Sequence, residues 1–424
     1  MSLTLLITML LGFTFSISIA VSIGGSAILG LTFFDSGKLI LVPKEMFTAI
    51  DKFPLAAIPF FILAGNLMET GGISRRLVNF AKSLVGGVQG GLPMTCVLTC
   101  MIFAAVSGSS VATTFAIGSI LIPALIKHGY PVGYAASLQA TSAELGVIIP
   151  PSIPMILYGV AAEVSIGELF IAGVVPGLLI GAALMLFVHL WCRFKGLGKN
   201  DGDDRLGVGP ATRDAGWALL MPVVILGGIY GGIITVAEAG AIGAFTALVG
   251  MVAMRRVTLK DITISMGDSV KVTGMLMMLV IGAQIMARFL AFSRVPRELV
   301  ALLEPILDQP YLLISMLMGL FFFAGMILES AAVIVLLVPM LLPLLQAAQI
   351  DLLWFGVMAS FMIALGLLTP PVGLSVYAAA SAARFPVAEV FRPTTVFAVA
   401  AGLIVTAAMM IFPGLVTWLP SHIQ

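Results

Sequence analysis

Two apolar stretches of this 424-residue chain are interrupted by proline at matching places. The first is LGVIIPPSIPMILYG, residues 145–159, and the second is LGLLTPPVGLSVYAA, residues 365–379. Proline lacks a backbone N–H, and its ring clashes with the carbonyl four residues earlier, so it breaks a helix. Each Pro-Pro pair therefore predicts a helix that stops and restarts within one apolar segment.

The sequence around these breaks is too apolar for a water-soluble protein. Hydrophobic residues make up 60% of the chain and charged residues 10%, against about 25% charged residues in soluble domains. Such a chain cannot cover itself with a water-facing surface, so we expect an all-α polytopic membrane protein. The formal net charge of +1 points away from nucleic acid as a partner.

Apolar segments of about 20 residues, the length that crosses a bilayer, recur along the chain. The candidates are residues 3–34, 53–70, 91–126, 132–160, 168–191, 215–234, 237–254, 264–291, 311–346, 352–381 and 393–418. Segment 3–34 is either one long span or two short ones that turn at Gly24-Gly25. Segments 91–126 and 311–346 are too long for one span and too short for two, which favours re-entrant hairpins.

One polar, glycine-rich region, residues 193–216, is interpreted as a linker between two halves. Two amphipathic stretches, 74–85 and 293–307, are typical of helices that lie along the membrane surface. Basic residues gather in 75–82, 193–213 and 255–260, and Lys and Arg favour cytoplasmic loops, so the linker is expected in the cytoplasm. Those at 38–52 and 294–297 would lie on the other side.

The two halves, residues 1–192 and 217–424, repeat with one offset. The same shift aligns several marked positions: Ser110 with Ser330, Pro123 with Pro343, and Pro150-Pro151 with Pro370-Pro371. If segment 3–34 forms two spans, each half crosses the membrane an odd number of times, and the second half inserts upside down. That inverted-repeat plan is typical of secondary transporters. If segment 3–34 is one span, the argument for inversion weakens.

Both breaks free backbone groups where water is scarce. Non-helical backbone survives at this depth only where it is buried in protein or lines a polar cavity. Freed carbonyls are hard oxygen ligands for a small cation, and the restarted half-helices point the positive ends of their dipoles at anions. The two breaks lie at matching positions of the repeat. We therefore interpret them as two ion sites beside one substrate site, and not as kinks that only adjust helix packing.

The other wall of each site is expected at a hairpin tip. In the first hairpin, five hydroxyls cluster around the turn at Gly108: Ser107, Ser109, Ser110, Thr113 and Thr114. These oxygens can coordinate Na⁺ and hydrogen-bond a carboxylate, or they only satisfy backbone groups and pack helices. The second tip, AGMILESAAV, carries Glu329, and a carboxylate inside the membrane is a functional candidate by default.

Arg288 is the basic counterpart of these candidates, in the apolar sequence IGAQIMARFLAF. It can clamp a substrate carboxylate in bidentate fashion, pair with Glu329, or extend to the interface as a snorkelling side chain. Glu144 and Glu238 are weaker candidates for the binding site, because both can lie near the ends of loops. Asn66 and Gln284 are amides suited to hydrogen bonds between helices.

These residues resemble a known family. SGSSVATTFAIGSILIPALIKHGY, LGVIIPPSIPMILYG, GGIYGGIITVAEAGAIGAF and LGLLTPPVGL are similar to the large membrane (M) subunit of tripartite ATP-independent periplasmic (TRAP) transporters, over essentially the whole chain. The resemblance implies an elevator-type, Na⁺-coupled transporter in the bacterial inner membrane. It also implies two partners, a small membrane (Q) subunit and a periplasmic substrate-binding (P) protein, and a small organic acid such as sialic acid or a C4-dicarboxylate. Many members carry Asp at the second tip, where this chain has Glu329.

The breaks, the tips and the resemblance together predict two groups of binding residues. The sodium-binding residues are Ser107, Gly108, Ser109, Gly146, Ile149 and Pro151 in the first half and Gly325, Glu329, Gly366, Thr369 and Val372 in the second. The substrate-binding residues are Ser110, Thr113, Ser152, Arg288 and Ser330.

Three other classes of function compete with transport. Hairpins and broken helices also build pores, so an ion or solute channel is the alternative, although a pore needs no repeat of a hydroxyl-rich and an acidic tip. An enzyme needs a nucleophile–base pair or a metal cluster, and the three cysteines and three histidines are too scattered for either. A pump driven by ATP is disfavoured because the sequence has no GxxxxGK(S/T) motif.

Overall fold

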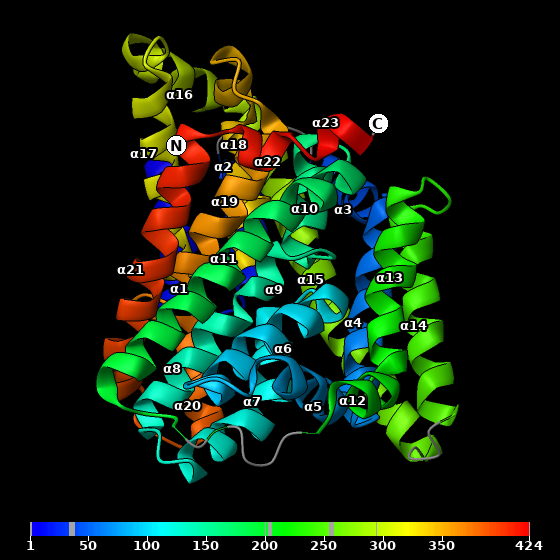
Figure 1. Cartoon of the computed structure of the whole chain (residues 1–424). Helices are drawn as coiled ribbons and strands as arrows, with labels where there is room; N and C mark the ends of the chain where they lie inside the picture. Colours follow the sequence, from blue (N-terminus) through cyan, green and yellow to red (C-terminus); the bar gives the residue numbers. More distant parts are fainter. Residues whose placement is uncertain are drawn as a thin grey trace.

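The computed structural model describes residues 2–33, 39–199, 201, 206–253, 258–293 and 295–423. The regular secondary structure of these residues is helical, from α1 (Ser2–Thr14) to α23 (Pro420–Ile423). Seven of the described helices, or eight if one bent pair is a single span, have the length and hydropathy to cross a membrane. The predicted all-α polytopic membrane fold is confirmed (Figure 1).

The first half contains a helical hairpin, α6 and α7, followed by a broken helix, α8 to α10. After α1 its helices are α2 (Ile19–Phe33), α3 (Leu41–Ile50), η1 (Phe53–Ala56), α4 (Ala57–Thr70), α5 (Ile73–Val85), α6 (Gly91–Ser107), α7 (Ser110–Lys127), α8 (Val132–Ala143), α9 (Leu145–Ile148), α10 (Ile153–Ala162) and α11 (Ile166–Lys195).

The second half contains the corresponding hairpin, α17 and α18, and broken helix, α19 and α20. Its helices are α12 (Val208–Asp214), α13 (Gly216–Tyr230), α14 (Val236–Ala253), α15 (Leu259–Phe292), α16 (Val295–Leu303), η2 (Glu304–Ile306), α17 (Pro310–Gly325), α18 (Ser330–Ala347), α19 (Leu352–Gly366), α20 (Leu374–Ala383), α21 (Val387–Ile411), α22 (Gly414–Thr417) and α23. The sequence offset that aligns Ser110 with Ser330 thus also aligns the first residues of α7 and α18.

The two hairpins lie at opposite ends of the molecule. In Figure 1, α6 and α7 occupy the lower part, whereas α17 and α18 occupy the upper part. At the lower end, Arg76 of α5 and Asp214 of α12 form an ion pair of 3.1 Å. Two of the three basic regions expected on one side of the membrane therefore meet at one end. Five basic residues of that argument lie outside the described residues: Lys38, Arg205, Arg255, Arg256 and Arg294.

Segment 3–34 forms two helices, but the predicted turn at Gly24-Gly25 is wrong. The chain turns between Thr14 and Ile19, and both glycines lie inside α2. A Cβ on Gly24 would lie 3.1 Å from the Cα of Gly282 in α15. Small residues let membrane helices approach closely, so Gly24 serves helix packing rather than a turn. Residue 34 lies outside the described residues.

Part of the predicted linker is packed against the first hairpin, although the sequence suggested that the whole linker is exposed to water. Asp201 is 3% exposed. Its Oδ2 accepts hydrogen bonds from the Tyr130 hydroxyl at 2.7 Å and from the Leu92 N–H at 3.1 Å. Gln89 Nε2 also donates to the Leu197 carbonyl at 2.9 Å. These contacts hold Leu197 and Asp201 at the start of α6; residues 200 and 202–205 lie outside the described residues.

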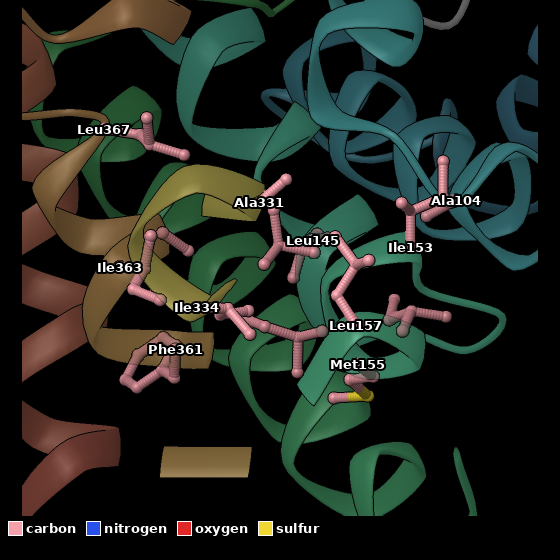
Figure 2. Packing of buried hydrophobic residues seen from close by; sticks show 14 of the residues in the cluster. Ala104, Leu145, Ile153, Met155, Leu157, Ala331, Ile334, Phe361, Ile363 and Leu367 are labelled. Atoms are coloured by element: carbon pink, nitrogen blue, oxygen red, sulfur yellow. The ribbon is translucent and has the colours of Figure 1, made fainter. Parts of the chain in front are cut away.

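Each broken helix packs against the hairpin of the other half. Helix α10 contacts α18 and α19, and α20 contacts α7 and α8. Figure 2 shows the apolar side of this arrangement, with Leu145 and Leu157 of the first half beside Ala331 and Ile334 of the second. The two breaks and the two hairpin tips are therefore parts of one packed unit.

Candidate functional site

The first break separates α9, which ends at Ile148, from α10, which begins at Ile153. Pro150 and Pro151 have no N–H, so the carbonyls of Gly146 and Val147 lose their helical donors. Ser152 compensates for one of them, because its Oγ donates to the Val147 carbonyl at 2.5 Å. The Gly146 carbonyl, which loses its helical donor to Pro150, is a candidate hard oxygen ligand.

The first hairpin tip lies directly on this break. Gly108 adopts a φ of +60° and its carbonyl accepts a hydrogen bond from the Ile153 N–H at 3.3 Å. A Cβ on Gly108 would lie 2.6 Å from the Pro151 carbonyl oxygen, and one on Gly146 would lie 3.2 Å from the Ser109 carbonyl carbon. Ser107 ends α6, and Ile149 lies within the break. The structure thus brings together all six residues predicted for the first sodium site.

The second break runs from Gly366, the end of α19, to Leu374, the start of α20. Thr369 donates its N–H to the Gly366 carbonyl and its hydroxyl to the Leu365 carbonyl, each at 2.8 Å. A Cβ on Gly366 would lie 2.7 Å from the carbonyl carbon of Gly325. Hairpin and break therefore meet in the second half as well.

The chain at the second tip is longer and carries the acid. The Met326 carbonyl accepts hydrogen bonds from the N–H groups of Val372 at 3.2 Å and Gly373 at 3.4 Å. Glu329 caps α18: its Oε2 accepts from the Ala331 N–H at 3.0 Å, and its Oε1 accepts from the Ser330 hydroxyl at 2.9 Å. The five residues predicted for the second sodium site thus lie at this tip and its break.

Both tips open onto one cavity of about 1140 Å³. Residues 107–110 of the first tip and Glu329 and Ser330 of the second line one side; α2, α4 and α15 supply the other. The N-termini of α7 and α18 start at these tips, and helix N-termini favour anions. None of the described residues that line the cavity is Lys, Arg or His. Its volume suits a small organic molecule.

Two of the five predicted substrate residues, Ser110 and Ser330, line this cavity. Thr113 does not; it is buried, and its hydroxyl lies 3.1 Å from the Ser107 hydroxyl and 2.8 Å from the Ser109 carbonyl. Ser152 is buried as well and caps α10. The role of these two side chains in the structure is to hold the tip and the break.

Arg288 lies away from the cavity lining. Its Nε is 3.3 Å from Oε1 of Glu45, on α3, and its guanidinium lies 5.1 Å from the centre of the Phe292 ring. The proposed pairing with Glu329 is therefore wrong, because the surface helix α3 brings another carboxylate to Arg288. A role for Arg288 in holding substrate stays a prediction that this geometry does not support.

Three further acids were weaker candidates in the sequence or were missed there. Glu238 is near a helix end, as expected, where it accepts a hydrogen bond from the Thr235 N–H at 2.8 Å. Glu144 lies in the turn between α8 and α9, shortly before the first break, and it is buried there, with 4% of its surface exposed. Glu69, which sequence reasoning missed, lines the cavity near Asn66, which donates to Ser269 at 2.8 Å. The available signal for Glu69 was an acid at the end of span 53–70.

Comparison with known proteins places the chain among membrane transport components. Residues 3–416 match the family model described as "Tripartite ATP-independent periplasmic transporter, DctM component". The C4-dicarboxylate TRAP transporter large permease protein DctM of Pseudomonas aeruginosa is 35% identical over 94% of this chain and 92% of that protein.

Two further matches are with a longer permease protein and with a solved structure. The isethionate TRAP transporter permease protein DctMQ of Oleidesulfovibrio alaskensis is 36% identical over 89% of this chain, which spans 60% of that protein. The crystal structure of the Alcanivorax borkumensis YdaH transporter aligns with 88% of this chain and 87% of its own, with a TM-score of 0.62 and 12% identity. At that identity, the second match shows the fold alone.

Proposed function

The chain belongs to the DctM family of tripartite ATP-independent periplasmic transporters, and on that premise we propose that it imports a small organic acid together with Na⁺. As a large permease subunit it is a multi-pass protein of the bacterial inner membrane and is not an enzyme. The substrate, the coupling ion and an elevator-type movement of the hairpins are parts of the proposal.

The single observation that carries this proposal is the cavity that both hairpin tips share. It is about 1140 Å³ in volume and has helix N-termini and serine hydroxyls on one side, a suitable environment for a carboxylate. Beside it, each tip meets a break whose prolines leave carbonyl oxygens without their helical donors. Such oxygens suit a small hard cation such as Na⁺, and a bound cation would offset the negative charge of Glu329.

The nature of the acid is proposed from the relatives. One relative is named for C4-dicarboxylates and another for isethionate, so family members differ in the anion they carry. A C4-dicarboxylate or a sugar acid such as sialic acid fits the cavity volume. We further propose two partners: a small membrane subunit, as the fused name DctMQ suggests, and a periplasmic binding protein, as the word tripartite implies.

Uptake into proteoliposomes tests the proposal. The chain is reconstituted with its small subunit, and labelled succinate or sialic acid is offered together with candidate binding proteins. We expect accumulation only with an inward Na⁺ gradient and only when a binding protein is present. Equal accumulation with K⁺ on both sides and no Na⁺ would contradict Na⁺ coupling. Full uptake of free substrate by the chain alone would contradict the three-component arrangement.

The channel alternative is tested in the same vesicles. A channel dissipates a substrate gradient and cannot build one, whereas a coupled transporter accumulates substrate above the outside concentration. The family assignment already favours the transporter. If the substrate only reaches equal concentrations on both sides of the membrane at every Na⁺ gradient, the channel alternative would be supported.

A further inference from the structure

One deeply buried acid is not explained by the cavity or by the proposed sodium ligands. Glu144 lies between α8 and α9, two residues before Gly146, and is 4% exposed. Its Oε1 accepts a hydrogen bond from the hydroxyl of Ser375, on α20 of the other half. Its Oε2 is buried with no hydrogen-bond partner in the described part of the chain. One carboxylate oxygen is therefore left without a ligand.

The described part of the chain provides no positive charge to balance this acid. Its three ion pairs join Arg76 to Asp214, Lys271 to Asp268 and Arg288 to Glu45. Two further polar groups lie near Glu144, the Ser110 hydroxyl and the carboxyl group of Glu329, and neither forms a hydrogen bond to its Oε2 in the described part of the chain. A buried ionised carboxylate without a partner is strongly unfavourable. A bound cation at Glu144 would remove this cost, and so would protonation of its carboxyl group.

The position of Glu144 identifies the site that lacks an anionic ligand. Gly146, on the same turn, packs against Ser109 and the Ser110 N–H of the first tip. The six residues predicted for the first sodium site offer only neutral oxygens, whereas the second site has Glu329. The halves do not supply their acids at matching positions, because the repeat pairs Glu329 with Ser109 and Glu144 with Ala364.

We infer that Glu144 is a further cation-binding residue, which provides the negative charge for a Na⁺ ion held at the first hairpin tip together with the Ser110 hydroxyl and the freed Gly146 carbonyl of the first break. This inference rests on the proposed Na⁺ coupling and adds to it. Ser375 then serves as a positioning residue, since its hydrogen bond fixes one carboxylate oxygen and leaves the other for the ion.

The test is Na⁺ binding without substrate. The chain, purified with its small subunit, is unfolded thermally at increasing NaCl with choline chloride as the balancing salt. Glu144→Gln keeps the size of the side chain and an oxygen that accepts from Ser375, but removes the charge. We expect it to raise the apparent Na⁺ dissociation constant at least tenfold. Glu238→Gln, which changes an acid at a helix start away from the site, is the matched control and should titrate like the parent.

The outcomes separate the inference from the proposed function. If Na⁺ does not stabilise the parent protein, both fail. If Na⁺ stabilises the parent and Glu144→Gln equally, the carboxyl group is neutral in the protein and the assignment of Glu144 is overturned.

A second variant keeps the inference testable if Glu144→Gln does not fold. Glu144→Asp keeps the charge but withdraws the oxygens by one methylene. It should still bind Na⁺, with an altered preference between Li⁺ and Na⁺. A Glu144→Asp protein with the parent's affinity for both ions would overturn the inference.

Discussion

The two hairpin tips share one backbone plan and differ in the side chains at corresponding positions. In the first tip, Ser109 caps α7 and the preceding residue is Gly108, at a φ of +60°. In the second, Glu329 caps α18 and the preceding residue is Leu328. The first tip is therefore tight and has only hydroxyl side chains, whereas the second is longer and carries a carboxyl group.

This difference shows which features of a duplicated fold are fixed by the backbone and which are free to vary. Both halves need a hairpin that ends against a helix break, because the freed carbonyls of each break must face a polar partner. The source of the polar partner varies between hydroxyl and carboxylate. Substitutions at corresponding positions can test whether the two tips differ in function as they do in chemistry.

Substitution of Gly108 should be the most damaging change. In Gly108→Ala the new Cβ lies 2.6 Å from the Pro151 carbonyl, at a φ of +60°. Left-handed backbone and overpacking together cost about 2–4 kcal/mol. We expect a lower free energy of unfolding and loss of Na⁺-driven uptake, measured by thermal unfolding and vesicle transport. Leu328→Ala is the matched control and should keep transport; equal loss in both would contradict the difference between the tips.

Removal of Glu329 should weaken Na⁺ dependence more than removal of Ser109. Hydrogen bonds that involve a charged group contribute about 1.5–3 kcal/mol and neutral ones about 0.5–1.5 kcal/mol. Glu329→Ala should therefore raise the Na⁺ concentration for half-maximal uptake roughly 10- to 100-fold, and Ser109→Ala roughly 2- to 10-fold. The measurement is a Na⁺ titration of initial uptake rates. A larger effect of Ser109→Ala would contradict the prediction that the carboxyl group of the second tip contributes more to Na⁺ dependence than the hydroxyl of the first.

The side chain of Ser152 should contribute to the free energy of unfolding, whereas that of Val372, at the matching position of the repeat, should not. Ser152→Ala leaves the buried Val147 carbonyl without its 2.5 Å donor, which costs about 1–3 kcal/mol. Val372, the residue at the matching position, is 36% exposed and has no hydroxyl, so Val372→Ser should change the free energy of unfolding by less than about 1 kcal/mol. Chemical unfolding in detergent measures both. Equal effects would mean that the two breaks are satisfied in the same way.

The smallest effect concerns Arg288. Its ion pair with Glu45 is partly exposed, with 47% of the Arg288 side chain accessible, and such pairs contribute about 0.2–1 kcal/mol. A double-mutant cycle of Arg288→Ala and Glu45→Ala should show coupling in the free energy of unfolding. The cycle of Arg288→Ala with Glu329→Ala should show none. Coupling only between Arg288→Ala and Glu329→Ala would show that Arg288 pairs with Glu329 and not with Glu45.

The membrane fold, the hairpins and the breaks could be predicted from the sequence. Each follows from local chemistry: long apolar runs must be helical in lipid because their backbone groups need internal partners, and a Pro-Pro pair removes two adjacent helical donors wherever it occurs. The offset that aligns Ser110 with Ser330 also aligns the first residues of α7 and α18, although the sequence predicted only the bounds of the whole hairpins. The polar tips were found because hydroxyls and acids are rare in such runs.

The three-dimensional structure was needed to find which of these polar groups meet. Arg288 pairs with Glu45, and Glu144 with Ser375, although 243 and 231 residues respectively separate them. It also showed that Gly24 packs helices and that Asp201 is buried against Tyr130. The physical reason is the same throughout: periodicity and composition report the partners a residue has on its own helix. Contacts between helices depend on how the two halves pack against each other, which local sequence does not encode.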